Sequence, residues 1–135
     1  MKKKQLALII LCSFFVITFS SCKKSKEAQA FDIRGAWSVE ITFDGPSGTG
    51  ALTFSGTLTN GTVTGTVDGV TSTGTYNVND RTITLALDQY HDAFGNIQYT
   101  GTGTASDNNN MAGTVVALFI DQNNQEKNGT WSCNR

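Results

Sequence analysis

The chain has 135 residues, with 14 glycines, a single proline and a formal net charge of −1. This length suits one folded domain and is too short for two. Six of the ten basic residues precede Phe31, whereas residues 31–135 hold ten acidic and four basic residues, a net charge of about −6. Nucleic-acid binding is disfavoured, because it needs clustered Lys and Arg to displace counterions.

The N-terminal segment is predicted to be a signal peptide. Lys2, Lys3 and Lys4 form a positive region, and an apolar stretch follows at residues 6–19. The sequence Phe-Ser-Ser-Cys at residues 19–22 resembles the lipobox of bacterial lipoproteins, in which small residues precede a Cys that is acylated and becomes the new N-terminus. The resemblance implies lipidation of Cys22. The next residue is Lys and not the Asp of inner-membrane retention, which implies sorting to the outer membrane.

Three segments are therefore expected. They are a lipoprotein signal peptide (1–21), a lipidated Cys with a flexible tether (22–30), and a folded domain (31–135). If Cys12 leaves with the signal peptide and Cys22 carries lipid, Cys133 has no partner for an internal disulfide. The expected location is the cell envelope, with a lipid anchor in the outer membrane that faces either the periplasm or the exterior.

From residue 37 onward, apolar and polar residues alternate with the period of strands that bury one face. Eight strands are predicted, and no convincing helix remains. Their inward-facing residues run through Trp37–Phe43, Leu52–Leu58, Val63–Val67, Val70–Val78, Ile83–Leu87, Ile97–Gly103, Met111–Phe119 and Gly129–Cys133.

The turns and the outward residues predict how these strands assemble. Asn60-Gly61 and Asp68-Gly69 are two-residue hairpin signals, so consecutive strands pair antiparallel. Closure into an eight-stranded up-and-down β-barrel removes the two exposed edges, and we favour it over a sandwich. Fifteen Thr fall almost entirely on outward positions, where a membrane-spanning barrel carries apolar residues, so a soluble all-β barrel is expected.

The first strand carries a family resemblance. Gly35-Ala36-Trp37 is similar to the Gly-x-Trp motif that opens the first strand of lipocalins and the wider calycin group. The resemblance implies that Trp37 closes the barrel floor and that a basic residue near the last strand stacks over it, for which Arg135 is the candidate. Biotin binding, known for the avidins of this group, is not supported by the residues after Trp37.

Barrel topology assigns the predicted loops to two ends. The loops at residues 60–61, 79–81 and 105–110 share the end of the N-terminus, and those at 44–50, 68–69, 88–96 and 121–128 form the other end, the expected mouth. The predicted mouth rim comprises Asp44, Asp68, Asp88, His91, Asp92 and Asp121. The predicted ligand-binding walls inside the barrel are Trp37, Phe43, Phe54, Tyr76, Tyr99, Phe119 and Trp131.

Two hypotheses for function remain open. The first is a lipocalin-like module that binds a small hydrophobic or amphiphilic ligand inside the barrel. The second is a filled barrel, such as an envelope inhibitor or adhesin, that contacts proteins through its loops around Tyr90, His91 and Phe94. No enzyme activity, metal or cofactor is expected, because His91 is the single His and no nucleophile or ligand cluster has the required spacing. A monomer attached to the membrane by its lipid is expected.

Overall fold

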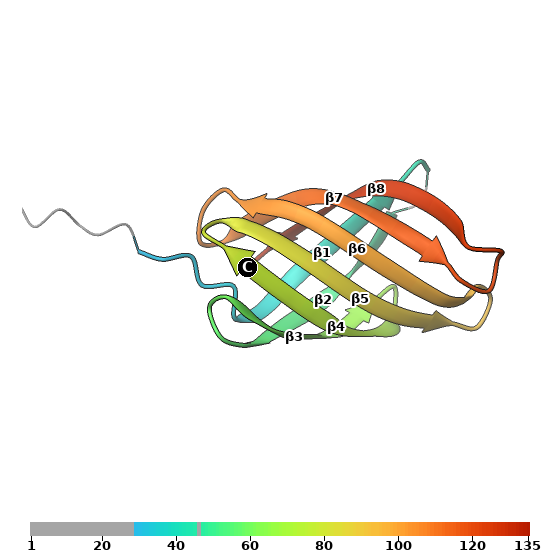
Figure 1. Cartoon of the computed structure of the whole chain (residues 1–135), viewed down its shortest axis with the longest axis horizontal. Coiled ribbons are helices and arrows are strands. Elements are labelled where there is room, and N and C mark those ends of the chain that lie inside the picture. The colour runs from blue at the N-terminus through green and yellow to red at the C-terminus, as the bar shows by residue number, and fades with distance from the viewer. Residues whose placement is uncertain (1–28, 46) are drawn as a thin grey trace, which may run out of the picture.

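A computed structural model describes residues 29–45 and 47–135, which form a closed barrel of eight antiparallel strands (Figure 1). The predicted signal peptide, Cys22 and most of the predicted tether lie outside the described residues. Within those residues, no helix is long and apolar enough to cross a membrane. The strands are β1 (Gly35–Phe43), β2 (Ser47–Gly56), β3 (Asn60–Val67), β4 (Val70–Asn79), β5 (Thr82–His91), β6 (Gly95–Ala105), β7 (Asn110–Phe119) and β8 (Gln125–Asn134).

The sheet closes through β1, which pairs with β2 on one side and β8 on the other. Each remaining strand pairs with its neighbours in the chain, so the predicted up-and-down order is confirmed. Closure leaves no strand with a wholly unpaired edge, which removes the site where an open sheet would pair with another chain.

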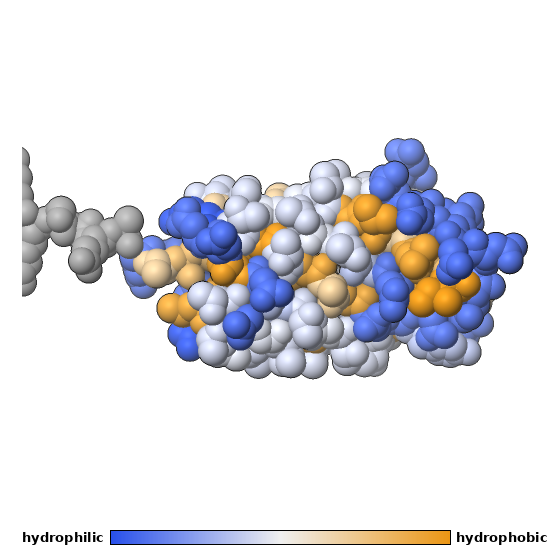
Figure 2. Space-filling view, in the orientation of Figure 1, coloured by the Kyte–Doolittle hydropathy of each residue, from blue (hydrophilic) through white to orange (hydrophobic). Residues whose placement is uncertain are grey.

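Alternation along each strand separates an apolar interior from a polar exterior. On β1, Trp37, Val39 and Ile41 are buried, and the residues between them are exposed. The fifteen outward Thr of the prediction are all exposed, and many pair across strands. One row runs round part of the barrel through Thr84, Thr102, Thr114, Thr130 and Thr42. Such pairs stabilise neighbouring strands, and they give the barrel wall the pale, near-neutral surface in Figure 2.

Inward glycines allow the strands to coil tightly. A Cβ at Gly113 would overlap the Thr102 carbonyl oxygen of β6, and one at Gly74 would overlap the Ala86 carbonyl oxygen of β5. A side chain at these positions would therefore push neighbouring strands apart. The glycines serve closure of the barrel, as strongly coiled sheets require, and they do not serve to leave room for a ligand.

Two turns test the hairpin predictions. Asp68 and Gly69 form the β3–β4 turn with φ values of 52° and 74°, as a two-residue hairpin turn requires. The prediction for Asn60-Gly61 is wrong, because these residues begin β3 and the turn lies at Thr57–Thr59. Leu58 consequently lies in that turn with 40% of its surface exposed, and it does not belong to the interior.

The loops at the mouth are shorter than predicted. β5 continues to His91 and β6 starts at Gly95, because Tyr90 pairs with Asn96 and His91 with Gly95. β8 likewise starts at Gln125, which pairs with Phe119. Backbone pairing therefore extends the strands through polar residues that the sequence pattern assigned to loops. Short turns of this kind leave the mouth uncovered.

The opposite end, here called the closed end, is filled by side chains. Residues before β1 cross it, with Phe31 and Ile33 buried beneath Trp37. The Trp37 Nε1 donates a hydrogen bond to the Ile33 carbonyl oxygen at 2.6 Å. Phe54 lies with its ring centroid 6.5 Å from that of Trp37. Tyr76 continues the row 5.5 Å from Phe54, so aromatic rings fill this half of the interior.

Arg135 fastens the closed end. Its guanidinium lies 4.3 Å from the Trp37 ring centroid, as the resemblance to lipocalins implied. The same group donates hydrogen bonds to the carbonyl oxygens of Arg34 at 2.9 Å and Asp32 at 2.8 Å. A third bond, from Nε, reaches the Asn108 carbonyl oxygen at 3.0 Å. One side chain thus connects the last strand, the segment before β1 and the β6–β7 turn.

Replacing this side chain tests its contribution to stability. We expect Arg135→Ala to lower the free energy of unfolding by about 1–3 kcal/mol, because a cation–π contact and several hydrogen bonds are lost. Arg135→Lys recovers only part of this, since an ammonium keeps the charge but lacks the planar fork of donors. Urea denaturation measures both variants. The control is Arg34→Ala, which removes an exposed guanidinium but keeps the carbonyl that Arg135 binds; equal losses for Arg34→Ala and Arg135→Ala would contradict this role.

Candidate functional site

The interior of the barrel is divided by a hollow near the mouth. Most buried apolar residues form one cluster that extends from the closed end, and Ile97, Ala117 and Phe119 form a separate cluster at the mouth. Phe43 and Tyr99 contact both clusters and are only partly buried. Residues of both clusters line a cavity of about 580 Å³ near the mouth, here called the cup. This volume falls within the range of small-molecule sites, roughly 300–1,000 Å³.

Apolar and aromatic side chains make the walls of the cup. Ile41, Phe43 and Val67 come from β1 and β3, and Ile97 and Tyr99 come from β6. The Phe43 and Tyr99 ring centroids are 6.4 Å apart. Each strand contributes inward residues at this level because its alternation continues to the mouth. The cup is therefore a mainly apolar space that opens to solvent at one end.

A hydrogen-bonded pair supplies the polar groups in this wall. Gln89 is only 6% exposed, and its Nε2 donates to the Val67 carbonyl oxygen at 3.0 Å. Its Oε1 accepts a bond from the Tyr99 hydroxyl at 2.8 Å. Burial, with a smaller contribution from the Asp68 carboxylate, raises the pKa of Tyr99, so the phenol keeps the proton that it donates. These bonds hold both side chains in place at the wall of the cup.

Charged groups stand around the opening. Asp44, Asp68 and Glu126 line it, together with the single ammonium of Lys127. The Lys127 Nζ lies 5.3 Å from the Phe119 ring centroid, so this cation is held over an aromatic face. Three carboxylates against one ammonium give the opening a negative potential. Such a field attracts cations and repels anions on approach.

The predicted interior residues divide between the two halves of the barrel. All face inward, and Phe43, Tyr99 and Phe119 line the cup. Three others, Trp37, Phe54 and Tyr76, do not reach it, because the residues before β1 close their end and the rings pack against one another. Trp131 lies between the halves beside a void of about 10 Å³, and its Nε1 has no hydrogen-bond partner.

The predicted rim residues also separate. Asp44, Asp68 and His91 line the cup, whereas Asp92 lies in the β5–β6 turn beside an outer groove. Asp88 does not belong to the rim: β5 continues through it, and the alternation turns its side chain outward, opposite Gln98 of β6. Asp121 accepts hydrogen bonds from the Asn96 backbone N–H at 2.9 Å and its side-chain amide at 3.2 Å, so it joins two hairpins.

Sequence reasoning missed several residues of the cup. Gln89 continues the inward series Ile83, Leu85, Leu87, and that spacing alone could have identified it. The loop predicted at residues 88–96 includes it, because the predicted strand ends at Leu87. Phe94 and Lys127 also line the cup, from a turn and from the start of β8. Lys127 continues the inward series of Gly129, Trp131 and Cys133, so the spacing could have identified it as well. Phe94 lies in a turn, where no alternation marks it.

Three features of the described residues bear on their possible chemistry. Within the part of the chain that the structure describes, no three His, Cys, Asp or Glu side chains are grouped to hold a metal ion. Cys133 is buried in the apolar core of the barrel, and burial raises the pKa of its thiol to about 12. The thiol is therefore protonated at neutral pH and is a poor nucleophile. The His91 Nδ1 accepts a hydrogen bond from the Ala93 backbone N–H at 3.1 Å, which orients the ring beside Phe94.

Comparison with known proteins supports the fold. No family model matches the sequence, and no curated protein matches it. Among solved structures, EF1p2_mFAP2b bound to DFHBI is similar with a TM-score of 0.63 and 16% identity, over 76% of this chain and 92% of that chain. A redesigned β-barrel, mFAP0, bound to DFHBI, is similar with a TM-score of 0.56 and 19% identity, over 76% and 97% of the two chains. At these identities the likeness establishes a lipocalin-like, closed eight-stranded barrel.

Proposed function

We propose that this protein is a lipid-anchored envelope protein whose barrel binds a small hydrophobic or amphiphilic molecule in the cup. The observation that carries the proposal is the uneven filling of the interior. One half is packed with aromatic rings, whereas the other holds about 580 Å³ between apolar walls with the Gln89–Tyr99 pair at one side. Sites for small molecules combine an apolar space with a few fixed polar groups in this way.

Two further observations support a ligand inside the barrel. EF1p2_mFAP2b and mFAP0 are each bound to DFHBI, so barrels of this architecture can take a small molecule. The negative opening favours ligands that are uncharged or cationic at their polar end. We infer that the ligand's apolar part enters first and that its polar part remains at the mouth.

The anchor and the cup lie at opposite ends in this proposal. Residues 29–34 leave the barrel at the closed end, away from the cup (Figure 1). A lipid on Cys22 would then hold the closed end toward the membrane, with the mouth directed away from it. A ligand could enter from the aqueous side without passing the bilayer.

Protein contact through the loops, the second hypothesis, required a filled interior and exposed Tyr90, His91 and Phe94. Tyr90 and Phe94 are exposed by 62% and 45%, but His91 is partly buried against the cup. The cup itself differs from the solid interior of that hypothesis. Ligand binding therefore has the stronger support.

Filling the cup tests the binding proposal. We expect Val67→Trp to weaken binding of the neutral dye Nile red by about tenfold or more, ~1.4 kcal/mol, because the indole occupies the cup. Thr66→Trp places the same side chain on the outer wall and should leave binding unchanged. Dye fluorescence measures affinity, and circular dichroism checks the fold. Equal binding by the parent and both variants, or no binding by the folded parent, would contradict the proposal.

Replacing Cys22 tests the anchor. We expect Cys22→Ser to move the protein from the membrane fraction to the soluble fraction, with an intact mass that lacks acyl chains. Cys12→Ser, within the predicted signal peptide, should leave both the fraction and the acylated mass unchanged. An unacylated mass for the parent protein would refute lipid anchoring without affecting the cup.

A further inference from the structure

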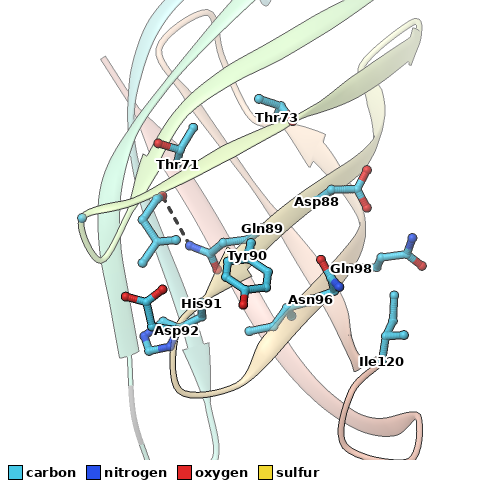
Figure 3. A pocket seen from close by; sticks show the side chains of 13 residues that line it. Thr71, Thr73, Asp88, Gln89, Tyr90, His91, Asp92, Asn96, Gln98 and Ile120 are labelled. Atoms are coloured by element: carbon cyan, nitrogen blue, oxygen red, sulfur yellow. Dashed lines mark hydrogen bonds between the residues drawn. The ribbon is translucent and has the colours of Figure 1, made fainter.

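A second hollow lies on the outer wall of the barrel near the mouth. It has a volume of about 850 Å³ and lies between the start of β4, the end of β5 and the start of β6, as Figure 3 shows. Here it is called the notch, and Thr71, Asp88, Tyr90, Asn96 and Gln98 are among its lining residues. Regular pairing of neighbouring strands would give a continuous wall here, so the notch must have a local structural cause.

The notch forms where two strands part. Pairing of β4 with β5 ends at Ser72 and Gln89, although β5 continues for two more residues. Those residues, Tyr90 and His91, pair only with β6. The β3–β4 hairpin ends in a turn of only two residues, so it does not extend as far as the β5–β6 hairpin beside it. The wall is therefore open between the two hairpins, and Gln89 bridges the inner side by donating to the Val67 and Val70 carbonyl oxygens.

Side chains in the notch suit a ligand rich in hydroxyl groups. Tyr90 lies at the centre of the notch and is 62% exposed. The carboxylate of Asp88 and the amides of Asn96 and Gln98 surround its ring (Figure 3). A carboxylate accepts hydrogen bonds from hydroxyls, an amide both donates and accepts them, and an aromatic face can cover the apolar side of a ring. The hydrogen bond marked in Figure 3 is that of Gln89. The Asn96 amide donates to the Asp121 carboxylate at 3.2 Å, whereas the side chains of Asp88, Tyr90 and Gln98 are not paired with one another.

The charge of the notch disfavours anionic ligands. No Lys or Arg is among its thirteen lining residues, whereas Asp88 and Asp92 both are. A phosphate, sulfate or carboxylate placed there would face two carboxylates without a cation to offset them. An uncharged polar group, such as a sugar, meets no such penalty.

The notch and the cup are neighbours. Gln89, His91 and Ile97 line both hollows, so these three residues form part of the wall between them. A molecule that fills the cup and leaves it past His91 would therefore reach Tyr90 directly.

We propose that the cup and the notch form one site for a glycosylated amphiphile, whose apolar part lies in the cup and whose sugar lies against Tyr90 in the notch. This inference rests on the proposed function of the cup and adds the chemical class of the head group. Tyr90 determines specificity for the sugar, and Asp88 and Gln98 bind its hydroxyls. The cup alone would not distinguish a sugar head from another uncharged one.

Three probes with the same alkyl chain test the head group. These are n-octyl-β-D-glucoside, 1-octanol and octyl sulfate, titrated below micelle formation by isothermal calorimetry. We expect the glucoside to bind about tenfold more tightly than octanol and octyl sulfate to bind most weakly. Tyr90→Ala should lower glucoside affinity about tenfold and leave octanol affinity unchanged. Tyr90 is exposed, so melting temperature should change little.

Two control variants separate the hollows. Phe94→Ala removes an aromatic ring that lines the cup and not the notch, so it should weaken both uncharged probes equally. Thr84→Ala, on the outer face of β5 beyond the notch, should change neither affinity. Equal affinity for glucoside and octanol, unaffected by Tyr90→Ala, would overturn the sugar site and leave the cup intact. Failure of both uncharged probes to bind the folded protein would overturn the sugar site and the proposed function together.

Discussion

The pairing of β1 with β8 fixes the width of the barrel, and the contents of the interior depend on that width. Eight strands enclose a space that side chains can fill or that can hold one small molecule. At the closed end, Phe31 and Ile33 add apolar volume from outside the strands, and the aromatic rings above them meet without a gap. At the mouth, the turns are too short to fold inward. The same cross-section is therefore packed at one end and hollow at the other.

Much of this fold could be predicted from the sequence, because period-two alternation and hairpin turns are local signals. The eight strands, the inward set from Trp37 to Trp131, the outward Thr and the Asp68-Gly69 turn all follow from them. Leu58 was misplaced because alternation does not show where a strand ends, and Gly56 has a φ of 136° that ends β2 there. Arg135 took the place that the resemblance to lipocalins implied.

The candidate site was less predictable, for a physical reason. The segment before β1 fills the closed end, and this decides which aromatic residues are left to line a ligand space. The alternation within the strands does not indicate how much of the interior that segment fills. Trp37, Phe54 and Tyr76 share the inward face with Phe43 and Tyr99, yet only the latter two reach the cup. The polar stretch from Asp88 to Asp92 was assigned to a loop, although pairing with β6 makes most of it a strand.

Polar groups at the mouth divide the surface into regions with different chemistry. Figure 2 shows strongly hydrophilic and apolar residues gathered at the far end, in contrast to the near-neutral Thr wall between the ends. Inside, Gln89 and Tyr99 satisfy each other and leave an apolar cup. Outside, Tyr90 and its neighbours remain available to solvent. The hydrogen-bonded side chain of Gln89 lies at the boundary between the two hollows, together with His91 and Ile97.

The location of the hollow is tested most directly by NMR of methyl groups during titration with 1-octanol. Shifts are expected at Ile41, Val67 and Ile97, which line the cup, and not at Ile33, Val63 and Ile83, which are fully buried toward the closed end. Shifts confined to the first set would establish that the open half receives an apolar ligand while the closed half stays filled. Shifts of equal size in both sets, or none in either, would contradict the division of the barrel into a filled half and a binding half.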